Sequence, residues 1–148
     1  MFNTICVGFD GSDSSTNALR VACDLAGKYG ASVHVVHTPH PETVAFALGA
    51  VAGYAVAAAM PSQKEVERAT ALMFEKARAI ASDAGQSEIQ THLGQGETGQ
   101  SIVMHSKACG ADLIVTGRRG LGNISTLVLG STSQSVGHLA DCAHLTVK

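Results

Sequence analysis

The apolar residues of this chain occur in two alternating kinds of run, and this alternation predicts a parallel α/β domain. Short apolar runs, typical of strands buried on both faces, lie at 3–9, 31–38, 87–93, 111–116 and 144–147. The longer segments between them place apolar residues three and four positions apart, as core-facing helices do. We therefore expect a single-domain, three-layer open parallel sheet of five strands in the order 3-2-1-4-5, with helices on both faces.

Capping residues predict where several helices begin and end. Ser12 or Ser14 is suited to cap the first helix, and Gly30 is suited to end it. Pro61 favours the first turn of a later helix, because its fixed backbone angle suits that position. The last helix is expected to begin at Ser131.

Residues 39–60 have no clear pattern. Positions 44–60 carry no charged side chain and are rich in alanine and glycine. The apolar surface of this segment must therefore be shielded from water. Two alternatives remain open: a partner subunit covers it, or it folds back on its own domain. The segment is shorter than the ~20 apolar residues of a spanning helix, and we expect no membrane span.

Composition excludes several classes of protein. The 148 residues suffice for one domain, and 45% hydrophobic against 15% charged residues is typical of a compact globule. A net charge of −2 provides no basic field for nucleic acid. The N-terminus shows no secretory signal, so we expect a cytoplasmic protein. No Cys-x-x-Cys pair is present, and Cys6, Cys23 and Cys109 are expected to be small buried hydrophobes.

The histidines do not predict a metal site. On an extended strand His34 and His40 lie on one face, about 20 Å apart, while His37 lies on the other. His105 and His138 fall on predicted helices and have no visible partner. We therefore interpret the histidines as scattered.

A glycine-rich stretch between the fourth strand and the last helix carries the functional signal. It contains Gly117, Gly120 and Gly130, with Arg118 and Arg119 adding positive charge. Phosphates bind at such positions in α/β proteins, because backbone N–H groups and the positive end of a helix dipole converge there. The lysine of a P-loop is missing. The alternative is that these glycines only form turns and bind no ligand.

The spacing Gly-x2-Gly-x9-Gly-Ser resembles the nucleotide loop of the ATP-binding members of the universal stress protein family. Residues 5–12 are similar to the first strand and Asp-Gly-Ser turn of that family, and residues 110–117 resemble its fourth strand. The resemblance covers nearly the whole chain, 1–148. The C-terminus departs from the family, because Ala143 stands where the family usually has proline.

The resemblance implies an ATP-binding protein whose Mg²⁺ is held mainly through the phosphates. The implied nucleotide-binding residues are Asp10, Thr38, Gly117, Arg118, Arg119, Gly120, Gly122, Gly130, Ser131 and Thr132. Asp10 is expected at the ribose, although it equally suits an Asx turn. The backbone of Thr38 is expected at the adenine, and Ser131 and Thr132 at the phosphates, although simple helix capping remains an alternative.

The resemblance also implies a homodimer that pairs through the last strand, and a nucleotide-responsive regulatory role. No catalytic residue is identified, because no general base is evident beside a γ-phosphate, so any ATP hydrolysis should be slow. Two other functions stay open: an ATPase or phosphotransferase that uses the same loop, and a protein-interaction module that binds no nucleotide.

Overall fold

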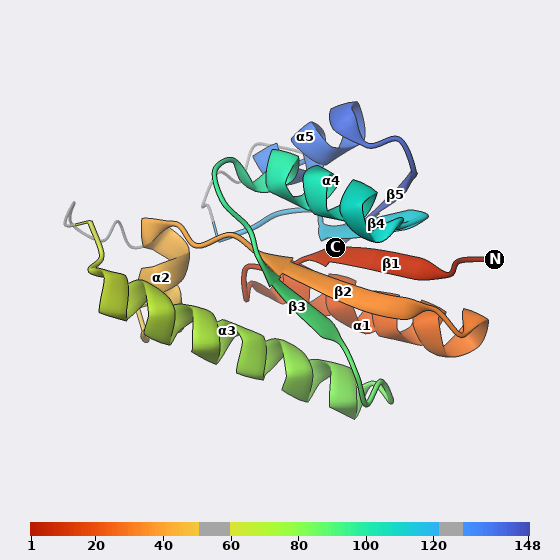
Figure 1. Ribbon diagram of the computed structural model, residues 1–148. Helices are drawn as coiled ribbons and strands as arrows, with labels where there is room; N and C mark the ends of the chain where they lie inside the picture. The colour runs from red at the N-terminus through yellow and green to blue at the C-terminus, as the bar shows by residue number, and fades with distance from the viewer. Residues whose placement is uncertain (51–59, 122–128) are drawn as a thin grey trace.

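The computed structural model describes residues 1–50, 60–121 and 129–148. Strands and helices alternate along these residues (Figure 1). Their bounds are β1 (Thr4–Gly8), α1 (Asp13–Tyr29), β2 (Ser32–His37), α2 (Pro41–Ala47), α3 (Gln63–Asp83), β3 (Gln90–Leu93), α4 (Thr98–Cys109), β4 (Leu113–Gly117), α5 (Ser131–Leu139) and β5 (Ala143–Val147).

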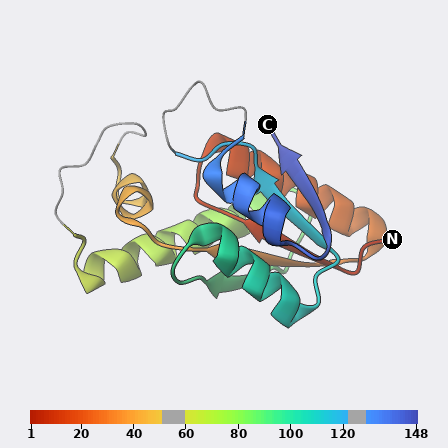
Figure 2. The same cartoon turned by 90° about the horizontal axis from the view of Figure 1, so that it is seen from above.

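The strands form one parallel sheet in the order β3-β2-β1-β4-β5, which confirms the predicted topology. Helices α1 and α3 cover one face of the sheet, and α4 and α5 cover the other (Figure 2). The strand order reverses between β1 and β4, and in open α/β sheets ligands bind at the carboxyl ends of the strands at such a point.

Alternate residues of the three central strands, β1, β2 and β4, supply the two layers of the core. Ile5 and Val7 of β1 pack in the layer under α1 and α3. Cys6, between them in sequence, packs with Ile102 of α4 and Ile114 of β4 on the other face. Because both faces are covered, these strands are apolar throughout, which is why the sequence predicted them well.

Three element boundaries differ from the prediction or refine it. The third strand begins at Gln90 rather than at 87, because its first residues do not pair with β2. Ser62 and Glu65 form a reciprocal capping box, so α3 begins at Gln63 and Pro61 lies before the cap rather than in the first turn. Ser12, not Ser14, caps α1.

The described part of segment 39–60 folds back on its own domain. It forms α2, which packs against α3 and buries Val44. The Lys76 ammonium of α3 lies 5.6 Å from the ring centroid of Phe46, and its Nζ donates to the backbone oxygen of Gly11 at 2.7 Å. Residues 51–59 of the apolar segment lie outside the described residues. Within the described ranges, no helix has the length and apolar character needed to cross a membrane.

Candidate functional site

A cavity of about 360 Å³ opens at the carboxyl ends of β1 and β4, beside the N-termini of α4 and α5. Its volume is typical of small-molecule sites. It brings together eight of the ten predicted site residues, which are Asp10, Thr38, Gly117, Arg119, Gly120, Gly130, Ser131 and Thr132. The sheet topology therefore joins segments that are more than 100 residues apart in sequence.

The remaining two predicted site residues are placed differently. Gly122 lies outside the described residues. Arg118 is not among the described residues that line the cavity. Its backbone N–H donates to the carbonyl oxygen of Val147 at 2.6 Å, and its own carbonyl accepts from the N–H of Gly130 at 2.8 Å. Arg118 thus ties the glycine-rich stretch to β5 and to the start of α5.

The N-terminus of α5 faces the cavity without a side-chain cap. Ser12, Ser62 and Glu97 each accept a backbone N–H at the start of α1, α3 and α4, respectively. Gly130 occupies the same position for α5 and has no side chain to offer. The first N–H groups of a helix have no intrahelical acceptor, and they attract anions together with the helix dipole. This end of α5 is therefore suited to a phosphate.

Asp10 presents one carboxylate oxygen to the turn and the other to the crevice. Its Oδ1 accepts hydrogen bonds from the backbone N–H and the hydroxyl of Ser12. Its Oδ2 lies on the side of Gly120, 2.7 Å from the position that a Cβ on that glycine would occupy. Asp10 therefore makes the Asx turn that was the alternative to a ribose contact, and its other carboxylate oxygen stays on the side of the cavity.

The three glycines of the motif have different surroundings. A Cβ on Gly117 would lie 2.8 Å from backbone atoms of Ser14 and Ser15, so β4 approaches α1 too closely for any side chain. A Cβ on Gly130 would lie 3.3 Å from the carbonyl oxygen of Arg118. Only at Gly120 is the close neighbour the end of a movable side chain, that of Asp10.

Thr38 follows β2 and lines the cavity. Its buried hydroxyl lies beside Gly94, where an added Cβ would clash with it. The hydrogen bonds found among the described residues include none to the backbone N–H or carbonyl of Thr38. Both groups are therefore available to a planar ligand edge that carries a donor and an acceptor.

The structure also adds residues that sequence reasoning missed. His40 Nε2 and the Thr98 hydroxyl lie 2.9 Å apart and join the end of β2 to the start of α4 across one wall of the cavity. Glu42 and Thr43 of α2 line the same wall. The position of Thr98 at a helix start after a Gly-x-Gly turn was a usable signal, whereas the contact with His40 requires the sheet order.

A hydrogen-bonded group fixes α5 relative to the sheet. The Thr116 hydroxyl lies 2.9 Å from the Ser133 hydroxyl and 2.8 Å from His144 Nε2, and the Ser133 hydroxyl donates to the carbonyl of Gly117 at 2.7 Å. Burial lowers the pKa of His144, which favours the neutral ring at neutral pH. His144 therefore supports β5, although the segment around it departs from the expected pattern.

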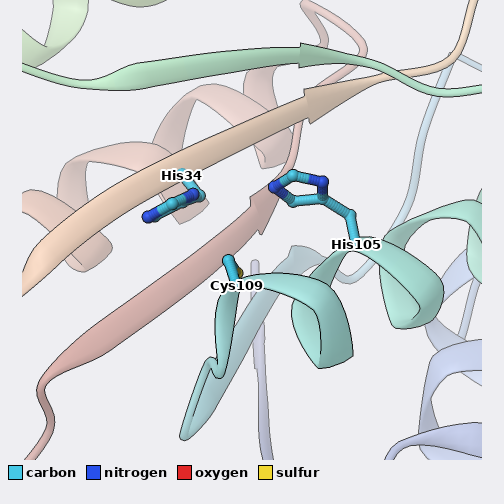
Figure 3. Close-up of side chains that lie close together, drawn as sticks. All are labelled: His34, His105 and Cys109. Carbon is cyan, nitrogen blue, oxygen red and sulfur yellow. The ribbon is translucent and has the colours of Figure 1, made fainter.

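A second group of side chains corrects the interpretation of the histidines. His105 was expected to have no visible partner, but its ring centroid lies 3.7 Å from that of His92 and 5.8 Å from that of His34. Cys109, expected to be buried, is only half-buried beside them (Figure 3). This group lies toward the C-terminal half of α4, whereas the N-terminal half of α4 borders the cavity.

The fold matches solved structures along nearly its whole length. One is a universal stress protein in complex with cAMP, with a TM-score of 0.72, 24% identity, and coverage of 99% of this chain and 96% of that chain. Another is the universal stress protein from Archaeoglobus fulgidus in complex with dAMP, with a TM-score of 0.65, 21% identity, and coverage of 99% and 98%. At these identities the likeness shows the fold.

Sequence relatives and a family profile agree with each other. Universal stress protein YxiE of Bacillus subtilis is 31% identical over 149 residues, covering all of both chains. A Thermus aquaticus protein, the universal stress protein in the QAH/OAS sulfhydrylase 3′ region, is 34% identical over 152 residues, again covering all of both. The profile described as "Universal stress protein family" matches residues 1–148. The chain belongs to the universal stress protein family.

Proposed function

We propose that this protein binds ATP in the cavity between β1, β4 and α5 and acts as a nucleotide-responsive regulator. The observation that carries the proposal is the uncapped N-terminus of α5, which meets the carboxylate of Asp10 in one cavity. Anion-binding N–H groups and a hydroxyl-binding carboxylate in one site match the phosphate and ribose ends of a nucleotide.

The lining residues fit the parts of ATP in order. The phosphates lie at Gly130, Ser131 and Thr132, with Arg119 adding positive charge nearby. Asp10 Oδ2 accepts from a ribose hydroxyl, and the backbone of Thr38 pairs with the adenine edge. The cAMP and dAMP complexes of two proteins that share this fold support an adenine nucleotide as the ligand.

Mg²⁺ fits this site as an ion carried by the nucleotide. Among the described residues that line the cavity, only Asp10 and Glu42 carry carboxylates, and Asp10 already serves the α1 turn. Mg²⁺ usually keeps several waters and takes the rest of its ligands from phosphates. The protein therefore supplies few ligands and leaves the ion on the phosphate oxygens.

Hydrolysis is expected to be slow. The described cavity residues include no lysine, and the acidic and imidazole groups of Glu42 and His40 belong to the wall formed by α2 and α4 rather than to α5. A fast ATPase requires a positioned base and strong charge stabilisation at the γ-phosphate. We therefore favour a binding protein over an ATPase or phosphotransferase.

The proposal is tested by calorimetric titration of nucleotide-free protein with Mg²⁺–ATP, followed by a turnover assay on the same sample. We expect saturable binding of one ATP per chain with turnover close to the uncatalysed background. Rapid hydrolysis that Asp10→Asn abolishes would support the enzyme alternative instead. Absence of binding would support the interaction-module alternative.

We further propose that the protein forms a homodimer through β5. This strand is at the edge of the sheet, and Leu145 on it is 37% exposed. An edge strand presents unpaired backbone groups that a second copy can satisfy. Light scattering should give the mass of a dimer for the native protein and a shift toward monomer for Leu145→Lys. The matched control is Leu139→Lys on α5, at a similarly exposed leucine; a monomeric native protein would exclude the dimer.

A further inference from the structure

Three histidines and one cysteine from three elements meet on the sheet face that α4 covers. His34 lies on β2, and His105 and Cys109 lie on α4 (Figure 3). His92 lies on β3, with its ring against that of His105. None of them lines the cavity described above. The group is therefore separate from the nucleotide site, and the inference drawn from it does not depend on the proposed function.

Local geometry explains why these side chains converge. In the parallel register Val36 is opposite His92, so His92 shares a sheet face with Val36 and with His34, two residues earlier on β2. On α4, His105 and Cys109 are four residues apart and thus lie on one helix face. Figure 3 shows the rings of His34 and His105 and the Cys109 side chain in the space between β2 and α4.

The ligand-type atoms are close enough to share one ion. One such atom from each of His34, His105 and Cys109 lies within 4.8 Å of the other two. Tetrahedral zinc with nitrogen and sulfur ligands places those atoms about 3.3–3.6 Å apart, so small side-chain rotations suffice to close the site. His105 Nε2 is buried and has no hydrogen-bond partner among the described residues, which leaves a polar atom that a metal would satisfy.

His92 serves as the outer partner of this group. Its Nε2 lies 3.2 Å from His34 Nδ1, so the two rings are linked by a hydrogen bond that fixes the orientation of His34. Histidines that bind metals commonly donate their second N–H to such a partner. Neutral imidazole is the form that binds metal.

We propose that His34, His105 and Cys109 form a binding site for a zinc-type divalent ion, with His92 as the residue that positions His34. Imidazole and thiolate donors select zinc and related transition metals over Mg²⁺ and Ca²⁺, which prefer oxygen. A bound ion would fasten α4 to β2 directly and to β3 through His92. Because β3 is a four-residue strand at the edge of the sheet, it stands to gain stability from this link.

The test uses the full chain without a polyhistidine tag, freed of metal with a chelator, and titrated with Co²⁺ as a spectroscopic substitute for Zn²⁺. We expect one Co²⁺ per chain, the visible bands of tetrahedral coordination, and a near-ultraviolet charge-transfer band from a Co²⁺–thiolate bond. Excess Zn²⁺ should remove these bands. Cys109→Ser should abolish the thiolate band, and Cys142→Ser, which changes another half-buried thiol, should leave it unchanged.

Affinity and stability provide a second readout. His92→Gln should weaken Zn²⁺ binding about 10–100-fold, and His105→Gln should weaken it more, because it removes a ligand rather than an outer partner. Zn²⁺ should raise the thermal unfolding midpoint of the native chain but not that of His105→Gln. Circular dichroism checks that each variant is folded. Absence of cobalt bands in the native chain, a thiolate band that persists in Cys109→Ser, or equal stabilisation of His105→Gln would overturn the proposal.

Discussion

Gly120→Val is expected to lower the affinity for ATP by on the order of 100-fold without unfolding the protein. Among the described residues, a Cβ at this position meets the carboxylate of Asp10 alone, with Oδ2 at 2.7 Å, so the carboxylate must turn away from the crevice. The change removes a charged hydrogen bond, which contributes roughly 1.5–3 kcal/mol, and the added methyl groups occupy ligand space.

Calorimetric titration with Mg²⁺–ATP checks this expectation. The matched control is Gly27→Val on α1, where a Cβ would make only an ordinary contact of 3.7 Å with Gln86. The control should bind ATP as the native chain does. If Gly120→Val also retained native affinity, the ligand could not lie between Asp10 and the glycine-rich stretch.

Gly117→Val is expected to cost about 3 kcal/mol or more of unfolding free energy, even though it belongs to the same motif. Its Cβ would lie 2.8 Å from the backbone of Ser14 and Ser15, and backbone at a helix start cannot move aside as a side chain can. Overpacking of this kind typically costs 1–3 kcal/mol, and more where relaxation is blocked, as it is here.

Urea unfolding followed by circular dichroism measures this loss, with Gly27→Val again as the control. We expect a clearly lower midpoint for Gly117→Val than for Gly120→Val. Equal midpoints for the two variants would contradict the assignment of Gly117 to packing and Gly120 to the ligand. Loss of ATP binding in Gly117→Val alone would therefore say little about phosphate contact.

The fold could be predicted from the sequence because its three central strands are buried on both faces and several of its helices have clear capping residues. Gly30 in the left-handed conformation at the end of α1 is one such signal, with a φ of 70°. The edges of the sheet were less predictable. The short β3 begins only at Gln90, because an edge strand pairs on one side and its polar first residues carry no distinguishing pattern.

The cavity was predictable in outline because the motif and the strand ends both indicate one edge of the sheet. Its far wall was not predictable, since the contact between His40 and Thr98 joins residues 58 positions apart. The group of His34, His92 and His105 was not predicted from the sequence for the same reason. His34, His92 and His105 meet only through the β2–β3 register and the packing of α4, and neither is visible in local spacing.

The measurement that tests the central claim most directly is mass spectrometry of the small molecules released when the purified protein is denatured. The same protein, stripped of ligand, is then titrated with ATP. We predict that ATP or AMP is released and that ATP binds again to the native chain but only weakly to Gly120→Val. No released adenine nucleotide, together with a stripped protein that does not bind ATP, would contradict the proposed function and leave only the fold.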